Sequence, residues 1–121
     1  MATIAYSTVR VEVNPVQTTV RVNLENRSLV DETVRVVVFN ATVSPKTPVL
    51  DQLLVVPANG TNTVDFTFPL LATFDYEVEV RTTSPFVVPY ITGLDAGLAA
   101  LSAQTFTYGD LLRQTTDAES I

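Results

Sequence analysis

The segment Phe74-Asp75-Tyr76-Glu77-Val78-Glu79-Val80-Arg81 alternates apolar and charged residues without a break. Successive side chains on a strand point to opposite faces of the sheet, so the apolar residues share one face and the charged residues the other. The pattern predicts a β-strand with one buried and one solvated face. A second apolar run, Phe86 to Ile91, follows after Ser84-Pro85. We expect the rest of the chain to cover the apolar face of this pair.

The same alternation recurs before this segment. It predicts strands over residues 8–13 and 18–24, each with one solvent-exposed face. Residues 32–43 form the longest apolar run. Both faces of that run carry apolar residues near Val37, which predicts a central strand covered on both sides.

Turn residues separate these runs. Asn14-Pro15 and Ser44-Pro45-Lys46-Thr47-Pro48 break the chain because proline restricts its own φ and the residue before it. Residues 50–56 read as a strand, and 57–61, with Asn59-Gly60, as the turn of a hairpin. Residues 93–101 favour a loop with an apolar side, and 105–108 a last strand.

Seven to nine strands at roughly 8 to 12 residue spacing predict an all-β fold, a single antiparallel β-sandwich of jelly-roll or Ig-like type. At 121 residues the chain is long enough for one domain. We assign residues 14–114 to the sandwich, residues 1–13 to an extended amino-terminal segment, and residues 115–121 to a frayed polar tail.

Composition excludes several classes of function. The chain has no cysteine and no histidine, which removes the commonest metal ligands and the usual nucleophile and base pairs. Its net charge of −6 and single lysine argue against nucleic acid as a partner. No apolar run is long enough to span a membrane. We expect no enzyme activity, no catalytic, cofactor-binding or metal-binding residue, and no small-molecule ligand.

Three groups of residues are candidate sites. Asp75, Glu77 and Glu79 could help to bind calcium or act as paired carboxylates, but alternate strand residues lie too far apart for one ion, and a solvated face is favoured. Lys46 would have to supply any lysine crosslink, yet it sits in a proline-rich turn. The third group is the four tyrosines, which could line a sugar-binding face but fit core positions better. They are Tyr6, Tyr76, Tyr90 and Tyr108.

The amino-terminal segment is extended and β-prone, with no glycine or proline before Pro15. It could pair within its own domain, or it could complete the sheet of a neighbouring copy. A head-to-tail contact of the second kind repeats without closing and makes a filament. In that case the intersubunit contacts would come from this segment and from the apolar loop after residue 93. The candidate contact residues are Ile4, Tyr6, Val9, Val11, Val13, Leu94 and Leu98.

From Val34 to Leu112 the chain resembles small β-sandwich proteins of spore-forming Firmicutes that lack a signal peptide, among them spore-surface and spore-appendage subunits. The similar stretches are Val34 to Phe39, Val56 to Thr61, Tyr76 to Val80, Ser84 to Pro89, Gly93 to Ala96 and Phe106 to Leu112. The resemblance implies assembly into fibres or a surface layer through an extended amino-terminal connector. It also implies release to the exterior or the spore surface when the mother cell lyses. The better-known appendage subunits carry connector cysteines that this chain lacks.

Together these features predict a structural, self-assembling subunit of an extracellular or spore-associated filament, with other copies of itself as its partner. Low charge, at 17% of residues, supports a surface covered by other subunits. The alternative is a monomeric β-sandwich module that binds carbohydrate or protein.

Overall fold

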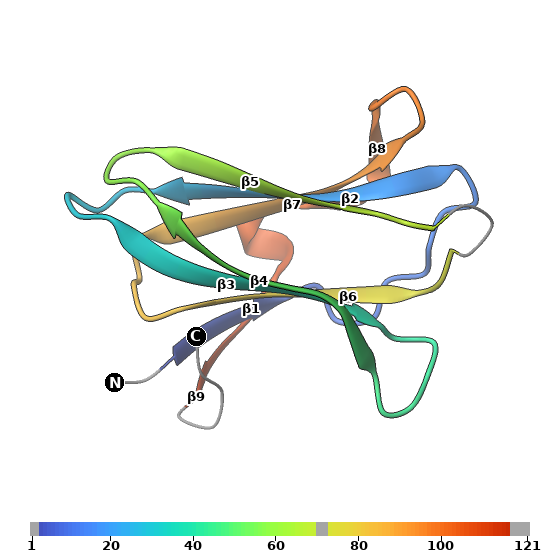
Figure 1. Ribbon diagram of the computed structural model, residues 1–121, viewed down its shortest axis with the longest axis horizontal. Helices are drawn as coiled ribbons and strands as arrows, with labels where there is room; N and C mark the ends of the chain where they lie inside the picture. The colour runs from blue at the N-terminus through green and yellow to red at the C-terminus, as the bar shows by residue number, and fades with distance from the viewer. Residues whose placement is uncertain (1–2, 70–72, 117–121) are drawn as a thin grey trace.

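The computed structural model describes residues 3–69 and 73–116, and two antiparallel sheets face each other across an apolar core (Figure 1). The predicted all-β sandwich is therefore confirmed. The described part of the chain contains nine strands and one short 3₁₀ helix. The elements are β1 (Thr3–Ser7), β2 (Gln17–Asn26), β3 (Glu32–Asn40), β4 (Thr47–Val56), β5 (Thr61–Thr67), β6 (Tyr76–Thr82), β7 (Val87–Asp95), β8 (Ala100–Phe106), η1 (Tyr108–Asp110) and β9 (Leu112–Thr116).

Sheet A has the strand order β4-β3-β6-β1-β9, and sheet B has the order β5-β2-β7-β8. All neighbouring strands in both sheets are antiparallel. The first and last strands of the described chain lie side by side, since Thr3 pairs with Thr116. Within the described chain, the free edges are β4 and β9 in sheet A and β5 and β8 in sheet B.

The core lies between the sheets and is made mainly of branched aliphatic residues. Valines at alternate positions of β2, β3 and β6 point inward and are almost fully buried. Such side chains pack well on a pleated surface, which is why the alternating runs form strands. Phe66, Phe68 and Phe74 form an aromatic cluster at one end of this core, and Phe68 contacts Tyr76 edge-on.

The alternating segment at residues 74–81 supplies most of β6, in the middle of sheet A. Tyr76, Val78 and Val80 are buried in the core, as the pattern predicts. The charged face differs from expectation, because Glu79 is only 5% exposed. The β3–β4 loop brings Lys46 over this face, with its Nζ 2.6 Å from an oxygen of Glu77. A strand inside a sheet is flanked on both sides, and a neighbouring loop can cover its polar face.

The prediction for residues 8–13 is wrong. The strand lies earlier, at β1, and the later residues contribute only an isolated bridge between Val11 and Tyr76. The chain leaves the sheet because Val9 has a left-handed φ of 51°, which lies outside the range of a regular strand. Apolar alternation does not reveal such a break.

The hairpin predicted at residues 57–61 is also wrong in its pairing. The turn forms where expected, and Asn59 has the positive φ of 55° that its Asn-Gly sequence favours. However, β4 before it belongs to sheet A and β5 after it to sheet B. The turn therefore carries the chain from one sheet to the other.

Two segments near the carboxyl terminus, the loop predicted at residues 93–101 and the tail predicted at residues 115–121, are shorter than expected. Residues 93–101 are the end of β7, a turn and the start of β8, so the loop is shorter than predicted. Thr115 and Thr116 pair with β1 in β9, so they do not belong to a frayed tail. The remainder of the tail, residues 117–121, and residues 1–2 of the amino-terminal segment lie outside the described residues.

Candidate functional site

The seven predicted contact residues fall into two groups. Only Val9 and Leu98 are well exposed, at 53% and 60%. The others are covered by their own domain: Ile4, Tyr6, Val11 and Leu94 are buried, and Val13 packs against the core. Five of the seven therefore contribute to the interior of the fold in the isolated chain.

Strand β1 is buried along its whole length. It inserts between β6 and β9, with Tyr6 opposite Val80 on one side and Arg113 on the other. All five of its residues are buried, although only Ile4 and Tyr6 belong to the core between the sheets. The Tyr6 ring lies 5.5 Å from that of Tyr108, and burial raises the pKa of Tyr6 above its ordinary value. Of the two pairings left open by the sequence, the isolated chain adopts the one within its own domain.

Val9 marks the point where the chain turns out of β1. A φ of 51° is uncommon for a β-branched residue, because Cβ approaches the following carbonyl oxygen. Two local hydrogen bonds hold this turn. The Val9 amide donates to Ser7 Oγ at 2.8 Å, and Thr8 Oγ1 donates to the Val9 carbonyl at 2.8 Å. The connection after β1 is thus a strained turn, and it carries an exposed apolar side chain.

A cluster of charged side chains covers the outer face of sheet A beside β1. Lys46 Nζ lies 2.6 Å from Glu77 and 3.6 Å from Glu79, and 4.3 Å from the centre of the Phe39 ring. Burial opposes the charge on Lys46, but the hydrogen bond and the field of the two carboxylates outweigh it and raise the pKa of Lys46. Ser7 Oγ also donates to Glu77, at 2.6 Å. The only lysine of the chain therefore pairs with two carboxylates and ties the β3–β4 loop to β6, and Arg81 lies 3.5 Å from the second of them, Glu79.

The three carboxylates considered as a calcium site do not converge. Asp75 accepts from Arg10 at 2.6 Å, and this hydrogen bond holds the pKa of Asp75 below its usual value. Glu77 and Glu79 face Lys46 instead. Among the described residues no group of three acidic, histidine or cysteine side chains is placed to hold a metal ion.

The four tyrosines lie in different environments. Tyr76 is fully buried in a polar network, where its hydroxyl accepts from Gln17 at 3.1 Å and donates to Gln104 at 2.9 Å. Burial raises the pKa of Tyr76 to about 12. The Tyr6 ring contacts that of Tyr108 at an angle of 54°, and Tyr90 alone of the four lies on the outer face of sheet B. They do not form one sugar-binding face.

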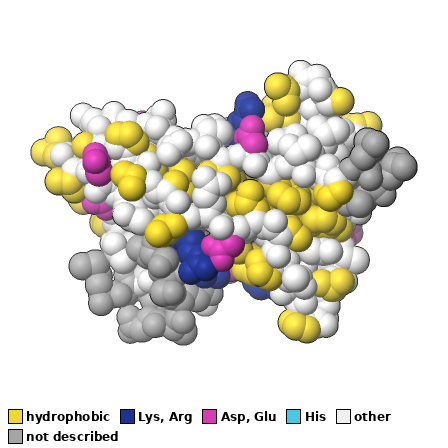
Figure 2. All heavy atoms as spheres, in the orientation of Figure 1, with side chains coloured by type: hydrophobic (Ala, Val, Ile, Leu, Met, Phe, Trp, Pro, Cys, Tyr) yellow, Lys and Arg dark blue, Asp and Glu magenta, His cyan; other side chains and the backbone are white. Residues whose placement is uncertain are grey.

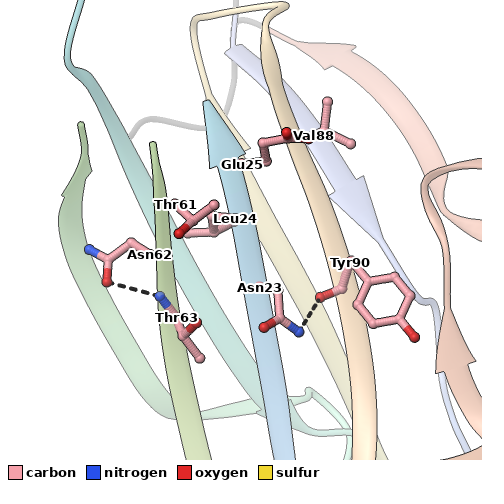
Figure 3. A pocket seen from close by; sticks show the side chains of 8 residues that line it. All are labelled: Asn23, Leu24, Glu25, Thr61, Asn62, Thr63, Val88 and Tyr90. Carbon is pink, nitrogen blue, oxygen red and sulfur yellow. Dashed lines mark hydrogen bonds between the residues drawn. The ribbon is translucent and has the colours of Figure 1, made fainter. Parts of the chain in front are cut away.

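The outer face of sheet B carries a shallow hollow across three strands, lined by both polar and apolar residues (Figure 3). It has a volume of about 260 Å³. Six of its eight lining residues lie at alternate positions of β2, β5 and β7 and so share the outer face, while Leu24 and Asn62 lie between them in the sequence. The lining residues are Asn23, Leu24, Glu25, Thr61, Asn62, Thr63, Val88 and Tyr90.

The surface carries few charged side chains. On the face in Figure 2, hydrophobic side chains spread between a few charged groups, several of which lie as opposite pairs. Edge strand β4 contributes Leu53 and Val55, which are 61% and 50% exposed. An apolar edge strand ten residues long is a ready template for pairing with another chain.

No family model and no curated protein matches this chain. Among solved structures, the Anabaena sensory rhodopsin transducer is 22% identical over 70% of this chain and 89% of that chain, with a TM-score of 0.50. The crystal structure of Thermotoga maritima 1070 is 10% identical over 95% and 93% of the two chains, with a TM-score of 0.54. Cowpea mosaic virus top component is 12% identical over 74% of each, with a TM-score of 0.47. At these identities the first two likenesses show the β-sandwich fold alone.

No helix in residues 3–69 and 73–116 is long and apolar enough to cross a membrane. Sequence reasoning missed the turn at Val9, because valine in an alternating run favours a strand. It also missed the hollow on sheet B, although the polar residues of the 18–24 alternation are a signal for it. The sequence does not show which strands lie beside these polar residues, because that depends on pairing between segments far apart in the chain.

Proposed function

We propose that this protein is a structural subunit that assembles with its own copies by exchanging β1. One observation carries the proposal: a strand buried on both sides, between β6 and β9, is joined to the rest of the sandwich by a turn strained at Val9. In the assembly, β1 of one copy would lie between β6 and β9 of the next.

The exchanged strand would make the same contacts in the neighbour as it makes in its own sheet. Tyr6 would again lie opposite Val80 and Arg113, and the buried outward residue Ala5 opposite Arg81 and Gln114. Because the pairings are equivalent, exchange loses no sheet hydrogen bond. Each copy gives β1 to one neighbour and receives one from another, so the contact is head-to-tail and extends into a filament unless its rotation closes a ring.

The strain at Val9 favours the exchanged form. A left-handed residue other than glycine costs roughly 1–2 kcal/mol, and an extended connection between two copies releases it. The opposing term is the entropy of association, which favours pairing within one chain at low concentration. We therefore expect assembly to depend steeply on protein concentration.

The surface and composition suit a subunit covered by its neighbours. Exposed apolar side chains lie close to the exchange site at Val9 and Leu112, which is 55% exposed, and both line the same hollow as Ala5 and Ser7. With no cysteine, cohesion would come from strand pairing and apolar packing. The resemblance to spore-associated proteins supports a filament outside the cell or on the spore surface.

Negative-stain electron microscopy with size-exclusion chromatography tests this function. The full chain should form fibres above a threshold concentration. A synthetic peptide of residues 1–13, added in excess, should shorten the fibres because it occupies the β6–β9 position without continuing the chain. A peptide of the same composition in scrambled order is the control. A monomer at every concentration would instead support the alternative, a monomeric binding module.

A further inference from the structure

The outer face of sheet B presents two rows of mainly polar side chains that the assembly does not use. In one row Asn23 lies opposite Thr63 on β5 and Tyr90 on β7. In the next row Glu25 lies opposite Thr61 and Val88. Strands lie about 4.8 Å apart and alternate residues about 6.8 Å apart, so the two rows cover roughly 10 Å by 7 Å. That area fits one or two sugar rings.

The polar groups of this hollow are available for a ligand. Asn23 Nδ2 donates to the Tyr90 carbonyl at 3.3 Å, which ties the amide to β7 (Figure 3). Its Oδ1 has no hydrogen-bond partner in the described part of the chain. The same holds for the hydroxyls of Thr61, Thr63 and Tyr90, all of which are exposed. Hydroxyls and an amide oxygen together offer both donors and acceptors, as a polyhydroxyl ligand requires.

The charges around the hollow are paired, which favours a neutral ligand. Glu25 lies 3.2 Å from Arg27, and Arg21 makes two hydrogen bonds of 2.9 Å with Asp65 in the neighbouring row. Both of these arginines are thus neutralised by a carboxylate, which weakens any attraction for phosphate, sulfate or a uronic acid. The net charge of −6 on the whole chain further disfavours a polyanion.

Tyr90 supplies the apolar contact that sugars need. It is 40% exposed, and in Figure 3 its ring lies along the outer side of β7, on the side away from Asn23. An exposed aromatic ring with its hydroxyl at the edge packs against the C–H face of a sugar ring while remaining solvated at one end. Val88 lies two residues away on the same face and extends this apolar strip.

We propose that the outer face of β5, β2 and β7 binds a neutral oligosaccharide, with Tyr90 stacking on one sugar ring and Asn23 and Thr63 binding its hydroxyls. The site does not depend on strand exchange, because β1 belongs to the other sheet. Failure of one proposal would therefore leave the other standing.

Four neutral hexasaccharides serve as probes: cellohexaose, chitohexaose, maltohexaose and β-1,4-mannohexaose. Each is titrated into the full chain by isothermal calorimetry and two-dimensional NMR, with hyaluronan as a polyanionic comparison. We expect at least one neutral probe to bind with a micromolar to millimolar dissociation constant, and hyaluronan to bind more weakly or not at all. Tyr90→Ala and Asn23→Ala should each weaken that binding tenfold or more.

Phe86→Ala is the matched control, since Phe86 is an exposed ring, at 57%, that does not line the hollow. It should bind the probe as the wild type does, and NMR spectra confirm that each variant is folded. The proposal is overturned if none of the four neutral probes binds, if hyaluronan alone binds, or if Tyr90→Ala leaves the affinity unchanged.

Discussion

Gly93 allows two strands to approach a buried polar side chain closely. A Cβ built at Gly93 would lie 2.6 Å from the Cβ of Gln104 and 2.7 Å from Nε2 of Gln17. Both glutamines are buried and hydrogen-bonded to Tyr76, so neither can move aside freely. This glycine is therefore required by packing, not by backbone conformation.

Gly93→Ala should lower the free energy of unfolding by about 1–3 kcal/mol, the usual cost of overpacking a core. Gly109→Ala is the control, because no neighbouring atom lies within 4 Å of the position that an added Cβ would take. It should change stability by about 0.5 kcal/mol or less. Urea denaturation of both variants measures the difference, and equal effects would contradict this account of the Gln17–Tyr76–Gln104 network.

The raised pKa of Tyr76 predicts a loss of stability in alkali. The unfolded tyrosine ionises near pH 10, whereas in the folded chain its pKa is about 12. The stabilisation is complete below pH 10 and is lost as the pH rises to 12, by roughly 2–3 kcal/mol. Burial of the hydroxyl is the cause.

Tyr76→Phe should remove most of this dependence. At pH 8 it should cost about 1–3 kcal/mol, because Gln17 and Gln104 lose a buried partner. Between pH 10 and 12 its stability should fall less than that of the wild type, with Tyr6 contributing the remainder. Urea denaturation at pH 8 and pH 11.5 tests this, and parallel losses in the two proteins would rule out Tyr76 as the source.

Sequence patterns at the level of single residues are informative where side chains alternate. The sequence predicts that Val78 faces the core and that the strand around Val37 is covered on both faces. Both residues are buried, so both predictions are confirmed. Burial of Glu79 does not follow, because it depends on Lys46 reaching over from a loop 33 residues earlier in the chain.

The turn after β1 is the element on which exchange depends. Val9→Gly should stabilise the isolated chain by about 1 kcal/mol, because glycine adopts a positive φ without strain and this gain exceeds its entropic cost. The same change should raise the concentration needed for fibres, since less strain is released.

Val16→Gly is the matched control, as Val16 is 59% exposed and has no positive φ. It should not stabilise the chain, and it should leave the fibre threshold near that of the wild type. Thermal unfolding and light scattering measure the two effects. A Val9→Gly variant that is no more stable than Val16→Gly would mean that the turn stores no strain.

Element prediction from the sequence is accurate for β2 and β6, which alternate strongly, and for β3, which is a long apolar run. It fails at the connections. Residues 57–61 have the sequence of a tight turn, but whether a turn joins strands of one sheet or of two depends on the twist and packing of the whole sandwich. The prediction for residues 8–13 fails because the left-handed turn at Val9, held by Ser7 and Thr8, leaves no trace in the apolar alternation.

The whole molecule is a sandwich in which the first and last described strands complete the same sheet. The fold class can be predicted from the alternation of side chains and the spacing of turns, but the order of the strands in each sheet cannot. The candidate sites can be predicted from the sequence only in part. Val9 and Tyr90 are among the candidate residues that the sequence indicates, whereas the hollow around Asn23 requires the register of three strands.

Engineered disulfides distinguish pairing within one chain from pairing between chains. Ala5 and Gln114 lie opposite each other on the outer face of sheet A. Opposed Cα atoms in antiparallel strands lie about 4.5–5.5 Å apart, which suits a disulfide, and the chain has no cysteine of its own to interfere. Thr33→Cys with Val55→Cys joins β3 to β4 and is the control, since those strands are not exchanged.

The measurement that tests strand exchange most directly is non-reducing gel electrophoresis of the Ala5→Cys, Gln114→Cys variant, oxidised at a concentration at which fibres form. If β1 is exchanged, this variant gives a ladder of covalent multimers and the control pair gives a monomer band. A monomer band for both, from samples that contain fibres, would show that β1 stays in its own sheet and that the fibres form without strand exchange.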